Sequence, residues 1–180
     1  MISNAPDSWL VMFVQVPSEP SRHRVAVWRE LRRFGAVPLG QGAWTAPDVP
    51  LCREGAGKAK ALARSGNGEL LLLTTAAAED DAATLRAAFD AARAEEWGEF
   101  TADCGKFTAE IAKEIAKKKF TLAELEEEEQ SLERLRRWYR AIRGRDVFGS
   151  PAADQAEQQM AACSAALDGF AAQVYKGVHS

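Results

Sequence analysis

Short apolar runs and amphipathic stretches alternate over the first 76 residues of the chain. The runs have the length of strands, and the stretches between them repeat their apolar positions with a helical period. The expected elements are a strand at 9–16, a helix that follows Pro20 and stops at Gly35, strands at 36–39 and 43–46, a helix at 52–63 and a strand at 69–75. This order of strand, helix, two strands, helix and strand is the split βαβ pattern of ferredoxin-like domains.

Four consecutive leucines, Leu70 to Leu73, mark the last of these strands. An uninterrupted apolar run is typical of a strand that is buried on both faces. We therefore expect 69–75 to be a central strand of the sheet.

The pattern becomes helical in the second half of the chain. Thr121 and Glu124 have the spacing of a capping box, and Ser150 with Pro151 is a typical start for the last helix. Apolar seams recur at helical steps, namely Phe100, Cys104, Phe107, Ile111 and Ile115, then Leu125, Leu132, Leu135, Tyr139 and Ile142, then Met160, Cys163, Leu167, Phe170 and Val174.

These patterns predict an α+β protein in two parts. We expect a ferredoxin-like βαββαβ domain over 1–78, packed with an antiparallel helical bundle over 79–180. Gly98 and Gly105 are the expected bends in the first helical stretch of the bundle.

The composition is ordinary for a soluble globular protein, with 47% hydrophobic residues, 27% charged residues and a net charge of −3. No apolar stretch approaches the ~18 residues of a membrane span. The first eight residues lack the basic start and apolar block of a secretory signal. We therefore expect a cytoplasmic protein with no membrane partner.

Charge divides unevenly along the chain. Residues 1–76 carry nine Lys/Arg and six Asp/Glu, whereas residues 77–180 carry 14 and 20. An acidic balance gives no general attraction to nucleic acid, so any DNA contact has to come from a local basic patch.

The first predicted helix holds the densest basic patch. On a helical wheel at ~100° per residue, Arg22, Arg29 and Arg33 share the face opposite the apolar one, and Arg32 lies about 80° from them. The stem of Arg24 instead points into the apolar arc. The candidate anion-binding or DNA-binding residues are Arg22, His23, Arg24, Arg29, Arg32 and Arg33.

Two interpretations of this patch stay open. It is either a solvated face whose charges pair with Glu19 and Glu30, or a site where first-turn N–H groups and guanidinium groups bind an oxyanion or DNA phosphates. Arg24 either reaches the rim of the core or meets an acidic group or a ligand. It is the residue of the patch that we single out first.

A second basic run, with Arg136, Arg137 and Arg140 at its centre, surrounds Trp138 and Tyr139. Aromatic residues among arginines can stack on nucleic-acid bases. We favour a structural role, because these arginines balance the acidic start of their own helix and Tyr139 belongs to its apolar seam.

The three cysteines are scattered and odd in number, which argues against a disulfide framework and a zinc cluster. Cys104 and Cys163 occupy apolar seams, so we expect Cys52 to be the more exposed thiol and the one candidate for redox chemistry. The histidines, His23 and His179, lack metal-ligand spacing, and no catalytic triad or nucleotide-binding loop stands out. We expect neither a metal nor a cofactor.

Several motifs carry a resemblance to a known family. They are Ser18 to Trp28, Leu31 to Ala36, Lys119 to Glu126, Leu135 to Trp138, and Arg145 to Pro151. In these motifs the sequence resembles the N-terminal region of ChrB, a chromate-resistance regulator encoded beside chromate efflux pumps in bacteria. Full members of the family carry a further C-terminal domain, which these 180 residues do not include, so its role is not carried over.

The first half also resembles, more remotely, the ferredoxin-like domain shared by the PaaX regulators and the CRISPR adaptation nucleases. Those nucleases place a metal-binding Asp at the end of their first strand, where this sequence reads Val14-Gln15-Val16-Pro17-Ser18. We therefore do not expect metal-dependent nuclease activity.

The resemblance to ChrB implies a cytoplasmic chromate-resistance protein that takes part in chromate-responsive transcriptional control. In this hypothesis the arginines of the first helix engage chromate, another oxyanion or DNA phosphates. The helical half would form a homodimer or bind a separately encoded C-terminal domain. Two alternatives stay open: a chromate-reducing or detoxifying enzyme that uses a thiol such as Cys52 or a borrowed cofactor, and a non-catalytic protein-interaction module.

Overall fold

The computed structural model describes residues 8–178, so His179 lies outside the described residues. Contacts between residues divide the chain into two compact units, residues 1–92 with 145–148, and residues 93–144 with 149–180. The division after Ala92 falls inside the long helix α3 (Glu79–Ala116). The first turns of this helix therefore belong to the first unit.

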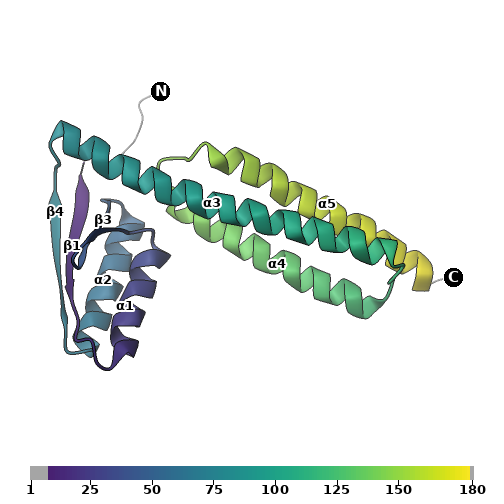
Figure 1. Cartoon of the computed structure of the whole chain (residues 1–180), viewed down its shortest axis with the longest axis horizontal. Coiled ribbons are helices and arrows are strands. Elements are labelled where there is room, and N and C mark those ends of the chain that lie inside the picture. The colour runs from purple at the N-terminus through teal and green to yellow at the C-terminus, as the bar shows by residue number, and fades with distance from the viewer. Residues whose placement is uncertain (1–7, 179–180) are drawn as a thin grey trace. The chain divides into compact units, whose positions relative to one another are not determined.

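The first unit is built on an antiparallel sheet with α1 and α2 on one face (Figure 1). Its elements are β1 (Trp9–Gln15), α1 (Ser21–Arg33), β2 (Val37–Gly40), β3 (Ala43–Pro47), α2 (Pro50–Ser65) and β4 (Glu69–Thr75). The strand order across the sheet is β2-β3-β1-β4, and every pairing is antiparallel. The predicted α+β class and the βαββαβ order are confirmed.

Successive side chains of β1 point to opposite faces of the sheet, and this alternation decides which of them enter the core of the unit. Leu10 and Met12 are fully buried, because they point to the face of the sheet that the helices cover. Val27 and Leu31 of α1, spaced by one helical turn, belong to the same cluster. Small side chains of α2 complete the cluster and let the helices pack closely: Ala56, Ala59 and Ala63.

The prediction of a central last strand is wrong. β4 lies at the edge of the sheet beside β1, and its side chains Leu71 and Leu73 are 56% and 45% exposed. These leucines lie on the face opposite α1 and α2. That face also carries an apolar cluster, to which the first turns of α3 contribute Phe89. The Phe148 ring packs against both Phe89 and Trp9 in this cluster.

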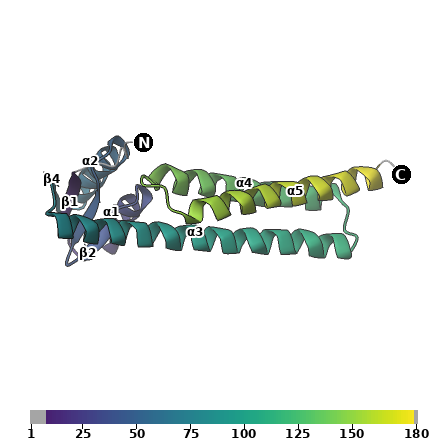
Figure 2. The ribbon, with the colours of Figure 1, turned by 90° about the horizontal axis from the view of Figure 1, so that it is seen from above.

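The second unit is a bundle of long antiparallel helices, in which α4 (Leu122–Arg145) and α5 (Ala152–Val178) lie beside α3 (Figure 2). α3 runs unbroken through Gly98 and Gly105, the expected bends. Most residues of the three predicted seams are buried in one cluster, so the seams pack on one another inside the bundle. No described helix is long and apolar enough to cross a membrane.

Both predicted helix starts are confirmed. The Thr121 hydroxyl accepts a hydrogen bond from the Glu124 backbone N–H at 3.2 Å, and the Ser150 hydroxyl accepts one from the Ala152 N–H at 3.3 Å. Each bond satisfies a backbone donor that the helix itself leaves open.

Two glycines of α2 test the packing of the first unit. A Cβ atom at Gly55 would overlap the ring of the buried Phe34, whereas one at Gly57 would meet no atom within 4 Å beyond its own helix. We expect Gly55→Ala to lower the free energy of unfolding by about 1–3 kcal/mol through overpacking. Gly57→Ala should raise it by up to about 1 kcal/mol through helix propensity. Urea denaturation measures both, and equal effects of the two substitutions would contradict this packing.

Candidate anion-binding site

A pocket of about 650 Å³ opens at one end of the sheet of the first unit. The end of β1, the β2–β3 turn, the α2–β4 turn and the first turns of α1 meet there. The lining residues are Val14, Gln15, Val16, Pro17, Arg24, Trp28, Gln41, Gly42, Asn67, Gly68 and Glu69. Of the predicted anion-binding residues, the pocket contains Arg24.

Two glycines let the turns approach β1 closely. A Cβ atom at Gly42, where φ is +80°, would lie 2.7 Å from the carbonyl oxygen of Val14, and one at Gly68 would overlap the carbonyl oxygen of Gln15. The Val14 N–H also donates to the Gly42 carbonyl oxygen at 2.8 Å. A larger side chain at either glycine would push its turn away from the strand and widen the pocket.

Arg24 lies on the flank of α1 that turns toward this pocket. Its guanidinium carbon is 5.5 Å from the centre of the Trp28 ring, one helical turn further on, a cation–π contact. Its Nε–H is buried and has no hydrogen-bond acceptor among the described residues. Leaving a buried donor unsatisfied costs about 1–3 kcal/mol, so this group favours any ligand that brings an acceptor.

Residues with neutral hydrogen-bond donors line the pocket together with Arg24. They are Gln15, Gln41 and Asn67, and each carries a carboxamide that can donate two hydrogen bonds. Glu69 also lines the pocket, but no ion pair joins it to Arg24 in the described structure. The pocket therefore combines one partly desolvated cation with several amide groups, a donor set that suits an oxyanion.

The remaining predicted arginines of α1 lie outside this pocket. Arg33 is paired with Glu30 at 2.6 Å, and this hydrogen bond raises the pKa of the guanidinium. The guanidinium carbon of Arg32 lies 6.0 Å from the ring centre of the buried Trp44. Arg22 and Arg29 are exposed and have no ion pair or hydrogen bond through their side chains within the described part of the chain. The predicted patch thus divides into a pocket residue and an exposed basic face.

His23 packs against the α2–β4 turn. A Cβ atom at Gly66 would lie 2.5 Å from the Cβ of His23, so the His23 side chain lies against the Gly66 backbone with no room for a side chain at position 66. The first turn of α1 holds no acidic residue, and its N-cap residue, Pro20, provides no side-chain hydrogen bond. The positive end of the helix dipole therefore adds to the field of the nearby arginines.

The prediction that Cys52 is an exposed thiol is wrong. Cys52 is fully buried, and its sulfur lies 3.7 Å from the carbonyl oxygen of Phe34, at the end of α1. Cys104 and Cys163 are buried in the bundle as expected. Burial raises the pKa of both thiols, that of Cys104 to about 12. A thiol of this acidity carries almost no thiolate, the reactive form, near neutral pH.

In the second basic run, the aromatic residues pack on the helical bundle and the arginines lie at its surface. Its aromatic residues, Trp138 and Tyr139, pack on Phe100 with ring centres 5.5 and 5.7 Å apart, so both rings contribute to the packing of the bundle. Its arginines lie at the surface, where Arg140 and Arg136 approach Glu133 at 3.1 and 3.9 Å and Arg137 is exposed.

Sequence reasoning missed the three carboxamides of the pocket. The glycine-containing turns that hold Gln41 and Asn67 are recognisable, but nothing in either turn shows that both meet the same strand end. That proximity follows from the register of the sheet, in which β1 pairs with β3 on one side and with β4 on the other. The signal is therefore in the strand order, which a single sequence does not display.

Comparison with known proteins relates most of the chain to one family. The family described as Protein ChrB, N-terminal, matches residues 24–180. Protein ChrB from Cupriavidus metallidurans is 30% identical over 169 residues, which cover 92% of this chain and 48% of that protein. The chain therefore spans about half the length of this curated relative. With a family match over most of its residues, the chain belongs to the ChrB family and corresponds to its N-terminal region.

Proposed function

We propose that this chain is the oxyanion-responsive regulatory region of a chromate-resistance protein. The pocket around Arg24 binds a tetrahedral oxyanion, and the exposed face of α1 contacts DNA phosphates. The observation that carries the proposal is the buried Nε–H of Arg24, which lacks an acceptor among the described residues and belongs to a side chain that lines the pocket together with three carboxamide-bearing residues. The link between the ChrB family and chromate resistance makes chromate the expected oxyanion.

The geometry of a tetrahedral oxyanion matches these donors. A guanidinium group binds two oxygens through a pair of parallel N–H donors, and Nε–H forms one edge of that fork. The contact with Trp28 holds the guanidinium plane in place, which lowers the entropy lost on binding. Amide groups of Gln15, Gln41 and Asn67 are then the donors for the remaining oxygens.

The helical layer of the first unit supports the DNA part of the proposal. α1 contains five arginines and one glutamate, and α2 contains four Lys/Arg and one glutamate. The net charge of −3 does not oppose a local contact here, because salt screens charges beyond about 10 Å. A bacterial protein that contacts DNA acts in the cytoplasm, which is the location that we propose.

The burial of the cysteines weighs against the thiol version of the enzymatic alternative. A thiol-based chromate reductase needs an accessible thiolate, and Cys52, Cys104 and Cys163 are all buried. A homodimer or a separately encoded C-terminal domain remains a proposed partner. The apolar seams of the second unit do not supply that interface, because they pack inside the bundle.

Arg24→Gln tests the oxyanion site. Arg33→Gln is the matched control, because it also removes one positive charge from α1. In calorimetric titrations with chromate, sulfate and phosphate, Arg24→Gln should weaken binding of the preferred oxyanion roughly tenfold or more, because a hydrogen bond to a charged group contributes about 1.5–3 kcal/mol. Arg33→Gln should change the affinity less than about threefold, since Glu30 already engages that charge. Equal weakening by both substitutions would indicate a diffuse electrostatic effect and contradict the site.

The salt dependence of DNA binding tests the exposed face of α1. On DNA that carries the promoter of the chromate-resistance genes, Arg22→Ala and Arg29→Ala should each reduce the slope of log affinity against log salt by about 0.9, the contribution of one phosphate contact. Arg53→Ala is the control, because Asp48 pairs with that guanidinium. Mobility-shift titrations at several salt concentrations measure the slope, and a slope that Arg22→Ala and Arg29→Ala leave unchanged would exclude phosphate contacts at α1.

The burial of the cysteines predicts slow thiol chemistry. In the native protein the three thiols should react with Ellman's reagent only as fast as the structure opens, and all should react at once in denaturant. Cys52→Ser should leave any consumption of chromate unchanged. A rapid phase of one thiol equivalent that Cys52→Ser abolishes would contradict this prediction and revive the enzymatic alternative.

A further inference from the structure

The second unit contains a groove of about 790 Å³ that the proposed function does not use. The groove runs along α3 and α4, and carboxylates outnumber cations among the residues that line it. These carboxylates are Asp103, Glu110, Glu114, Glu124, Glu127 and Glu128.

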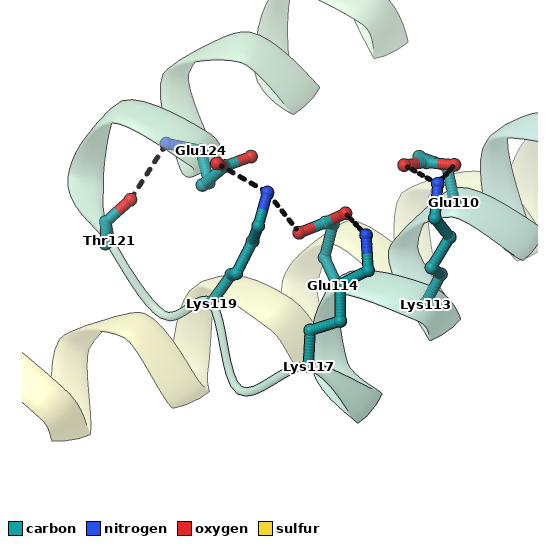
Figure 3. A network of polar contacts seen from close by, with 7 residues as sticks. All are labelled: Glu110, Lys113, Glu114, Lys117, Lys119, Thr121 and Glu124. Carbon is teal, nitrogen blue, oxygen red and sulfur yellow. Dashed lines mark hydrogen bonds and ion pairs between the residues drawn. The ribbon is translucent and has the colours of Figure 1, made fainter.

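Most charged groups of the groove are already paired (Figure 3). Lys119 bridges Glu114 and Glu124 with 3.2 Å to each, and Lys113 approaches Glu110 at 2.8 Å. The other cations of the groove are engaged as well, Lys106 with Asp103 at 2.7 Å and Arg134 with the Ser131 hydroxyl at 2.9 Å. Lys117, outside the lining, also approaches Glu114 at 3.4 Å. Each of these cations is therefore already engaged by a group of the protein itself.

Glu128 differs from these carboxylates. It occupies an inward position of α4 between Leu125 and Leu132, is only 7% exposed, and forms no side-chain hydrogen bond or ion pair with any described residue. Burial, and then the negative charge of neighbouring glutamates, raises the pKa of its carboxyl group. A carboxylate on a side chain that is largely withdrawn from water, as this one is at the wall of the groove, favours a cation or a hydrogen-bond donor that reaches it.

The surroundings of Glu128 select the kind of cation. Within residues 8–178, no group of three or more His, Cys, Asp or Glu side chains could hold a metal ion. Phe107, Leu135 and Trp138 give the groove an apolar wall beside its carboxylates. A primary ammonium group donates three hydrogen bonds, and the methylene stem that carries it packs on apolar surface.

We propose that this groove binds a primary ammonium group on an aliphatic stem, with the carboxylate of the largely buried Glu128 as its acceptor. The exposed Glu127 meets the same charge at the mouth, and the stem lies along Leu135 toward Trp138. Glu128 and Leu135 are two helical turns apart, about 10 Å, which matches an extended chain of methylene groups. A polyamine and a lysine side chain of a partner protein both carry this chemistry. The site lies entirely in the second unit and does not depend on the anion pocket.

Calorimetric titration of the full chain with spermidine at constant ionic strength tests this site. The wild-type protein should bind saturably, and Glu128→Gln should weaken binding roughly tenfold or more, because the charged acceptor is lost. Glu126→Gln removes the same charge from an exposed position of α4 that does not line the groove, and should change the affinity less than about twofold.

A third variant and two further ligands complete the test. Glu128→Gln should keep or raise the unfolding midpoint, since it removes a charge that burial disfavours. Glu127→Gln should weaken binding by an intermediate factor. Tighter binding of acetyl-Ala-Lys-Ala-amide than of spermidine supports a lysine of a partner, and the reverse order supports a polyamine. Absent binding of both amines, equal effects of Glu128→Gln and Glu126→Gln, or full displacement of spermidine by an equal concentration of Mg²⁺ would overturn the proposal.

Discussion

One hydrogen-bond donor without an acceptor is the constraint on which the anion-binding hypothesis depends. Arg24 lies on the flank of α1, so its Nε–H is withdrawn from water, and no acceptor reaches it from the described residues. Trp28 restricts the guanidinium group through a cation–π contact. The free energy lost by leaving the donor unpaired is regained by any ligand that brings an oxygen to it. Exposed arginines such as Arg22 have no such deficit, because water satisfies them.

The ferredoxin-like topology gathers the other polar groups around that donor. Antiparallel pairing of β1 with β3 and with β4 brings two turns to the same strand end. Gly42 and Gly68 allow these turns to approach the strand backbone, where a Cβ atom would clash. Gln41 and Asn67, distant in sequence, therefore line one pocket with Gln15. The pocket is a consequence of strand order, and neither turn has recognisable binding chemistry by itself.

Features that depend on local chemistry are predictable from this sequence, and features that depend on which surfaces meet are not. The element order and the caps at Thr121 and Ser150 follow from apolar period and hydrogen-bonding capacity. Arg24 is recognisable because a charge at an apolar wheel position conflicts with its neighbours. A run of leucines fits an edge strand as well as a central strand, so the composition of β4 does not decide its position in the sheet. Cys52 is buried because α2 begins at Pro50, which brings residue 52 against the end of α1.

Each unit holds a charged side chain without a hydrogen-bond partner for a desolvated polar group within the described residues, the Nε–H of Arg24 in the first unit and the carboxylate of Glu128 in the second. The central claim concerns the first, and NMR of the arginine side chains tests it most directly. Sulfate, a redox-inert tetrahedral dianion, should shift the Nε–H resonance that disappears in Arg24→Lys and slow its exchange with water, while the resonances of Arg22 and Arg29 move little. An Arg24 resonance that saturating sulfate leaves in place, or equal shifts of all arginines, would contradict the claim.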